Sequence, residues 1–198
     1  MQDRRNTGSA GALDRSGGWP AALRFLLERH PRAGWDGQAA LGPLARYWLD
    51  RHAGFRELSA MLGEAAAAFE AGRLPAGEFR PWFAPRLHYL LTHLDGHHQV
   101  EHYYYFPRLR AAEPRLAAGF EALAADHAAL ERAIVEIVEA ANALLTATAG
   151  GDAERAAGGR YVAASGRLLG GLGRHLDDEE DLVIPLLLDR GEDALGVG

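Results

Sequence analysis

Two copies of one short motif place histidine and glutamate at a spacing that suits metal binding. His97 and Glu101 are four residues apart, and His175 and Glu179 repeat that spacing in the second half of the chain. Four residues along an α-helix advance about 400°, so each histidine lies on the same face as its glutamate, about 6 Å away along the axis. Imidazole nitrogen combined with carboxylate oxygen suits iron, manganese or zinc. The two motifs therefore predict a metal site built from two helices.

A second repeat makes this prediction more specific. His52 lies ahead of the first motif and His127 ahead of the second, and Pro107 and Pro185 follow the two glutamates at equal distances. Because both halves of the chain keep this order and spacing of histidine, glutamate and proline, they indicate two helical hairpins of the same design. One such motif alone is weak evidence, whereas two copies with upstream histidines are much stronger. Glutamates that can bridge also favour a two-metal redox centre over a single structural zinc.

Four long helices must position these side chains. Apolar residues recur with a helical period in four stretches, which run from Pro43 to about Ala71, from about Trp82 to Ala111, from about Arg115 to Ala147 and from about Arg160 to Leu188. Residues 72–81, 113–114 and 150–159 are expected to be the loops between them. Four helices with short connections predict an all-α, up-down-up-down four-helix bundle with the metal site inside. Pro107 and Pro185 are expected to kink or end the second and fourth helices.

The expected domain organisation has one bundle and three smaller parts. Residues 1–18 are polar and rich in glycine and serine, which is typical of a flexible tail. Residues 19–43 hold a short extra helix near Pro20 to Arg29 and a connecting loop. The bundle is expected over residues 44–190, and residues 191–198 form a C-terminal tail.

Composition excludes several classes of partner and site. The 198 residues are 48% hydrophobic, enough for a buried core, and the net charge is −6 with no block of lysine or arginine. That charge argues against nucleic acid or anionic membrane as a partner. No apolar run approaches a membrane span, and the start lacks a secretion signal, so we expect a cytoplasmic protein. Without cysteine, thiolate zinc sites and ordinary iron–sulfur ligation are excluded, so a metal must rely on imidazole and carboxylate.

With these motifs in order, the chain resembles the hemerythrin-like, HHE cation-binding domains from about Leu44 to Leu188. The resemblance implies a hemerythrin-like bundle around a non-haem di-iron centre, two iron ions with an oxo or hydroxo bridge. Carboxylates would bridge the irons and histidines would complete each one. Matched residue by residue, the implied metal ligands are His52, His97, Glu101, His127, His175 and Glu179.

The sequence departs from hemerythrin proper on the third helix. Hemerythrin has two histidines four residues apart there, whereas His127 has Leu123 one turn before it and Glu131 one turn after it. One iron therefore lacks a histidine and keeps an exchangeable position, or it takes a substitute ligand. The candidates are Glu131 and His98, which follows His97 and lies about 100° around its helix.

Other polar residues near the motifs have weaker cases. His93 lies one turn before His97 and is expected to support a ligand, whereas His102 is expected to support a ligand or to lie at the surface. Tyr105 is one turn after Glu101, so its hydroxyl is expected either to bond a bound oxygen species or a ligand, or to pack at the bundle end. The acidic run 177–181, apart from Glu179, is expected to be a solvated face.

The resemblance implies a non-haem di-iron-binding protein that binds or reacts with dioxygen, peroxide or nitric oxide. Its partner would be a small diatomic or peroxide ligand, and peroxidase-like or catalase-like turnover stays open. The alternative is a non-enzymatic iron or oxygen sensor, or an interaction module whose metal site is mainly structural. Peroxide turnover by the iron-loaded protein separates the two, and the sequence identifies no protein partner.

Overall fold

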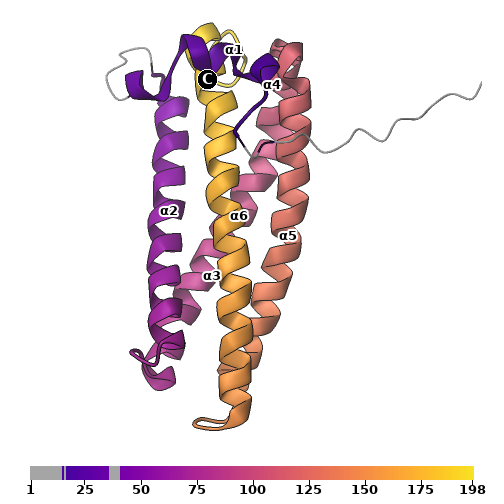
Figure 1. Ribbon diagram of the computed structural model, residues 1–198. Helices are drawn as coiled ribbons and strands as arrows, with labels where there is room; N and C mark the ends of the chain where they lie inside the picture. The colour runs from indigo at the N-terminus through magenta and orange to yellow at the C-terminus, as the bar shows by residue number, and fades with distance from the viewer. Residues whose placement is uncertain (1–14, 16, 36–40) are drawn as a thin grey trace, which may run out of the picture.

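The structure is a computed structural model that describes residues 15, 17–35 and 41–198, and across these residues it is helical with no strand. The long helices are α2 (Pro43–Glu70), α3 (Ala76–Val100), α5 (Ala117–Thr146) and α6 (Asp152–Arg190). Figure 1 shows them side by side as an elongated bundle, which confirms the all-α prediction. Most of the predicted tail 1–18 and part of the predicted loop 19–43 lie outside the described residues.

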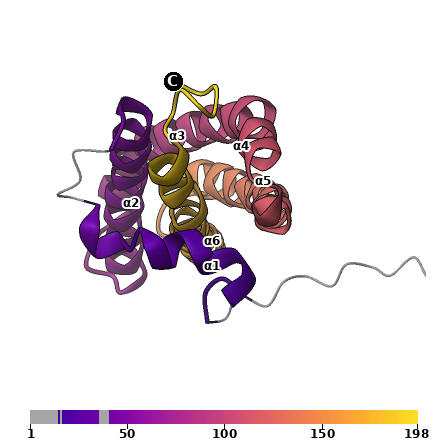
Figure 2. The same cartoon turned by 90° about the horizontal axis from the view of Figure 1, so that it is seen from above.

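Shorter elements complete one end of the bundle. After α3 come a π turn (Glu101–Tyr105) and the short helix α4 (Phe106–Ala112), and a 3-10 turn (Pro114–Leu116) then leads into α5. Helix α1 (Ala21–Arg29) crosses that end against α6, as seen from above in Figure 2, and a 3-10 turn (Arg32–Gly34) follows it. Every helix in the described part of the chain is too short or too polar to cross a membrane.

Two helices begin earlier than the sequence predicts. Helix α3 starts at Ala76 and includes Pro81, because the burial of Phe79 in its first turn outweighs the hydrogen bond that proline cannot make. Helix α6 starts at Asp152 and runs through Gly158, where a Cβ would lie 2.6 Å from the ring of Phe69. Sequence rules read proline and glycine as loop residues, but here tertiary packing keeps both inside helices.

The two repeated prolines have different effects. Pro107 comes directly after the π turn, in which the Phe106 N–H bonds to the carbonyl of Glu101, five residues earlier. A proline ring clashes with the carbonyl four residues before it, and the wider turn relieves such a clash. Pro185 is buried inside α6, which continues to Arg190. The chain therefore leaves α geometry just before Pro107, between α3 and α4, whereas α6 continues past Pro185.

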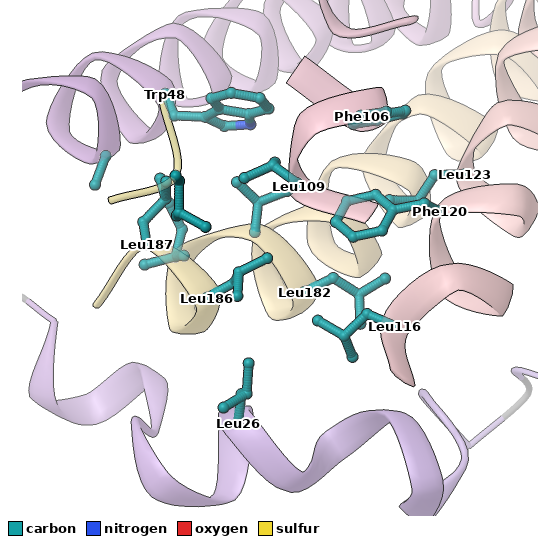
Figure 3. Packing of buried hydrophobic residues seen from close by; sticks show 14 of the residues in the cluster. Leu26, Trp48, Phe106, Leu109, Leu116, Phe120, Leu123, Leu182, Leu186 and Leu187 are labelled. Atoms are coloured by element: carbon teal, nitrogen blue, oxygen red, sulfur yellow. The ribbon is translucent and has the colours of Figure 1, made fainter. Parts of the chain in front are cut away.

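The core has two apolar clusters. Figure 3 shows the one at the α1 end, where Leu26, Phe106, Leu123 and Leu182 converge from four helices. The C-terminal residues after α6 add Leu195 and Val197 to it. The far cluster includes Phe79, Phe83, Leu90, Tyr161 and Leu168. Between these two clusters, buried histidine and glutamate side chains form a polar layer inside the bundle.

Candidate metal centre

Seven buried or nearly buried side chains form two adjoining groups inside the bundle. Within each group, one nitrogen or oxygen of every residue lies within 4.8 Å of the others. The two-histidine group contains His52, His97, Glu101 and Glu179, and the three-histidine group contains His98, Glu101, His127 and His175. The structure thus brings together all six side chains of the implied ligand set and adds His98.

Glu101 belongs to both groups. Its Oε1 lies 2.7 Å from His97 Nε2, one helical turn earlier, and its Oε2 lies 3.4 Å from His127 Nε2 on α5. It is the first residue of the π turn, a type of turn that is frequent at functional sites. The carboxylate is 1% exposed, and among the described residues neither oxygen has a hydrogen-bond donor.

Glu179 has the same arrangement from the opposite helix. Its Oε1 lies 3.4 Å from His52 Nε2, and its Oε2 lies 3.1 Å from His175 Nε2. The indole of Trp48 donates a hydrogen bond to Oε1. Each glutamate therefore has one oxygen near a histidine of each group, as a carboxylate that bridges two metal ions would, and Glu101 is a full member of both groups. Sequence reasoning missed Trp48, because its contact joins two helices and no spacing within one helix reveals it.

His98 supplies the third nitrogen of its group. It follows His97 on α3, and the step of about 100° around the helix turns it toward α5. Its ring stacks on His127 with centroids 4.0 Å apart, and its Nε2 is buried without a hydrogen-bond partner in the described chain. The alternative substitute, Glu131, is exposed and belongs to neither group. Leu123 is fully buried in the apolar cluster beside them.

The weaker candidates lie around the two-histidine group or outside it. His93 is partly buried and its ring packs on Tyr89, with centroids 4.1 Å apart. His102 is exposed. Tyr105 is partly buried with its ring 5.0 Å from that of Trp48, and it lines a cavity next to the site. None of these three side chains belongs to a ligand group within the described residues.

Two outer carboxylates face the far edges of two histidines, one through a hydrogen bond and one at ion-pair distance. Glu180 Oε1 accepts a hydrogen bond from His52 Nδ1 at 3.0 Å, and Asp126 Oδ2 lies 3.7 Å from His175 Nδ1. Carboxylates in these places orient the rings so that Nε2 faces the metal. Glu180 is 3% exposed, and Asp178 and Asp181 are only partly exposed, so the expectation of a solvated acidic face was wrong for most of the run 177–181.

Burial and charge give the histidines opposite pKa shifts. Burial lowers the pKa of His97 to about 3, of His98 to about 2 and of His127 to about 4, so these rings are neutral ligands at neutral pH. Burial also opposes protonation of His175 and His52, but adjacent carboxylates outweigh it. They raise the pKa of His175 to about 9 and raise that of His52 above its ordinary value.

The pKa values of Glu101 and Glu179 also shift in opposite directions. Burial and the neighbouring Glu179 raise the pKa of Glu101 well above its usual value. Burial opposes the ionisation of Glu179 as well, but the charges of His52 and His175 lower its pKa well below the usual value. With a pKa of about 9, His175 carries a proton at neutral pH in the metal-free site, and metal binding must displace that proton.

Two cavities border the site from different sides. One of about 340 Å³ between α2 and α3 reaches His97 and Glu101 and is lined also by Trp48, Arg51 and Tyr105. Its wall includes exposed side chains, so it connects the two-histidine group with solvent. The other, of about 470 Å³, touches His175 from the side of Asp126, behind the ring edge that faces the centre.

The residues present fit two metal ions. Buried polar atoms without partners in the described chain include both oxygens of Glu101, Oε2 of Glu179 and Nε2 of His98. Such atoms are costly to bury unless something binds them. Five imidazoles and two carboxylates, with no cysteine in the chain, form a donor set that suits iron, manganese or zinc.

The family model described as Hemerythrin HHE cation binding domain matches residues 44–193, about three quarters of the chain. That span contains α2 to α6 and every residue of the two groups. No curated protein and no solved structure matches the chain.

Proposed function

The chain belongs to the hemerythrin HHE cation-binding family, as its motifs predict, and on that premise we propose that it is a di-iron protein of the cytoplasm. It binds two iron ions between its four long helices and reacts with dioxygen, peroxide or nitric oxide. One observation carries the proposal: Glu101 and Glu179 each present one oxygen to each histidine group.

The ligand set favours two redox ions over a structural zinc. Structural zinc takes four ligands, most often with cysteine, whereas here seven side chains serve two adjoining groups. His98, His127 and His175 would hold one iron, His52 and His97 would hold the other, and both glutamates would bridge. When bound, the iron pair supplies electrons to dioxygen or peroxide, chemistry that no side chain of this protein offers.

The protein's own residues direct a small ligand to the two-histidine group. The cavity of about 340 Å³ ends at His97 and Glu101, so a diatomic molecule or peroxide has a path from solvent. Arg51 lines this path and offers a positive charge to an approaching anion. The ring of Phe106 stacks on that of His127 with centroids 5.4 Å apart and, with the buried Leu123, gives the three-histidine group an apolar cover on this side. An open path on one side favours a reactive centre over a closed structural site.

Anaerobic loading of the purified protein with Fe²⁺ tests the proposal. We expect two irons per chain by metal analysis, with Mössbauer and optical signals of a coupled pair. Hydrogen peroxide should then be consumed, with evolution of dioxygen or oxidation of a reductant. One ion per chain, or zinc alone after iron loading, would overturn the di-iron proposal. Two irons with no consumption of peroxide and a long-lived oxygenated spectrum would favour a carrier or sensor.

A further inference from the structure

The N-terminal segment, residues 15 and 17–35 as described, contacts the outer edge of the metal centre. It lies outside the span that matches the family. Two of its arginines bind the carboxylates that stand behind His175 and His52. The segment packs on α6, so residues far apart in the sequence meet there (Figure 2).

Arg15 acts on the side of His175. Its Nη2 and Nη1 donate to the two oxygens of Asp126 at 2.6 and 2.7 Å, and Nη1 also reaches Asp178 at 2.8 Å. A two-pronged pair of this kind fixes both the place and the angle of the carboxylate. Asp126 in turn lies 3.7 Å from His175 Nδ1, an ion-pair distance, and that nitrogen has no hydrogen-bond partner among the described residues. The Trp19 indole donates to the carbonyl of Asp178, and its ring lies 5.0 Å from the Arg15 guanidinium, which anchors the arginine.

Arg32 acts on the side of His52. Its Nη1 donates to Glu180 Oε2 at 2.7 Å, and its Nε donates to Asp181 at 2.6 Å. The other oxygen of Glu180 accepts the hydrogen bond of His52 Nδ1. Arg56 of α2 also donates to that oxygen, at 2.7 Å. Glu180 is therefore held by two arginines, whereas Arg15 alone of the described arginines bonds Asp126.

We propose that Arg15 and Arg32 are positioning residues for the metal centre. By fixing Asp126 and Glu180, they hold His175 and His52 with Nε2 toward the metal and so strengthen metal binding in both groups. The docked N-terminal segment is thus part of the metal-binding machinery of this chain. This inference rests on the proposed function, because it requires metal in both groups.

The same segment offers an arginine with a purely structural contact. Arg29 of α1 pairs with Asp189 near the end of α6 and reaches no carboxylate beside a metal-facing histidine. Buried Leu23 and Leu26 dock α1 independently of these charges. Removing Arg29 therefore measures how much the loss of one salt bridge at this end of the bundle lowers stability, while Asp126 and Glu180 keep their contacts.

The test uses the full chain with Arg15→Gln, Arg32→Gln and the control Arg29→Gln. Competition with a chelator under anaerobic conditions gives the affinity for Fe²⁺, and the metal-free proteins are melted in parallel. We expect Arg15→Gln to weaken iron binding by up to about tenfold, the lower end of the effect of removing a partner behind a ligand, because Asp126 itself remains. Arg32→Gln should weaken it less, since Arg56 still holds Glu180. Arg29→Gln should leave the affinity unchanged.

Two further readouts separate positioning from general stability. Arg15→Gln should change the Mössbauer parameters of one of the two irons, and Arg15→Lys should restore part of the affinity. Equal iron affinity in all variants, or losses that only track the melting temperature of the metal-free proteins, would overturn the inference and leave the proposed function intact. A wild-type protein that binds no iron would overturn both.

Discussion

The two halves of the metal centre share their glutamates but differ in ligands and surroundings. The three-histidine group is covered by Phe106 and Leu123, and the cavity beside it touches only the outer side of His175, whereas the two-histidine group borders a cavity that reaches His97 and Glu101. The half with fewer protein ligands is therefore the half that a small molecule can reach. We infer that one iron is held firmly and the other is left able to accept an exogenous ligand.

Removing a shared glutamate should have the largest effect, because it breaks both halves at once. Glu101→Gln keeps the size of the side chain but can no longer supply the anionic oxygens that metal binding in both groups requires. We expect iron content after loading and dialysis to fall from two ions per chain to less than about one. Elemental analysis checks this result. Glu131→Gln, on an exposed face of α5, is the control and should keep both ions.

If Glu101→Gln retained its full iron content, the shared-carboxylate arrangement would not be the basis of metal binding. Glu179→Gln should repeat the loss, since Glu179 also presents one oxygen to each group. A loss in only one of the two variants would mean that only one glutamate bridges.

Adjacent histidines on α3 should separate the two halves. His98→Ala removes a ligand from the covered group, and His97→Ala removes one from the group beside the cavity. Each variant should retain about one tightly bound iron, but only His98→Ala should still bind azide, because its remaining ion faces the cavity. Iron analysis and an optical azide titration check this. His102→Ala, at an exposed position, should behave as wild type.

The same azide response in both α3 variants would contradict the assignment of the open position. It would mean that a small ligand reaches either iron, so that the cavity between α2 and α3 does not decide access.

Helical spacing explains which part of the centre the sequence could predict. His97 with Glu101, and His175 with Glu179, share helix faces, and this follows from the helical repeat alone. The four-helix bundle likewise follows from apolar periodicity, and both it and the family are confirmed. The choice of His98 over Glu131 stayed open, because it depends on how α3 turns toward α5 when the bundle packs.

Contacts between helices account for what the sequence missed. Asp126 and Glu180 adjoin motif residues, yet each supports a histidine on another helix, so no spacing along the chain reveals it. The acidic run looked like a solvated face because its partners, Arg15 and Arg32, lie about 150 residues away in the sequence. Helix α6 began earlier than expected because the contact of Gly158 with Phe69 appears only in the packed bundle.

Filling the cavity should sharpen the difference between the halves without removing metal. Gly96 lines the cavity on α3, and a Cβ built on it meets no atom of the described chain within 4 Å. Gly96→Leu should fit the helix, fill part of the path and slow the reaction with peroxide by about tenfold, while iron content stays at two. Stopped-flow kinetics check the rate.

Gly77→Leu is the matched control, since Gly77 is exposed on the same helix and also has open space around it. It should leave the rate unchanged. An equal slowing in both variants would attribute the effect to α3 itself and not to the cavity.

The smallest expected effect is a pH dependence that distinguishes the histidines with a raised pKa from those with a lowered pKa. Asp126 and Glu179 raise the pKa of His175 to about 9 against the effect of burial, and the pKa of His52 is raised as well. A raised histidine pKa stabilises the folded state fully below the ordinary value of 6.5, and that stability is lost as pH rises toward 9. His97, His98 and His127 have lowered pKa values. They therefore destabilise the folded state only below pH 6.5, where the unfolded chain binds protons that the folded protein does not.

Between pH 6.5 and 9 the metal-free protein should therefore melt at progressively lower temperature, by several degrees in total. Binding of Zn²⁺, used as a redox-inert probe, should strengthen over the same range, because the metal no longer competes with protons on His175. Melting curves and zinc titrations across this range check both trends. Asp126→Asn removes a partner that raises the His175 pKa, so it should flatten the melting trend. Melting temperatures of the metal-free protein that rise with pH would show that His175 is neutral before metal binds.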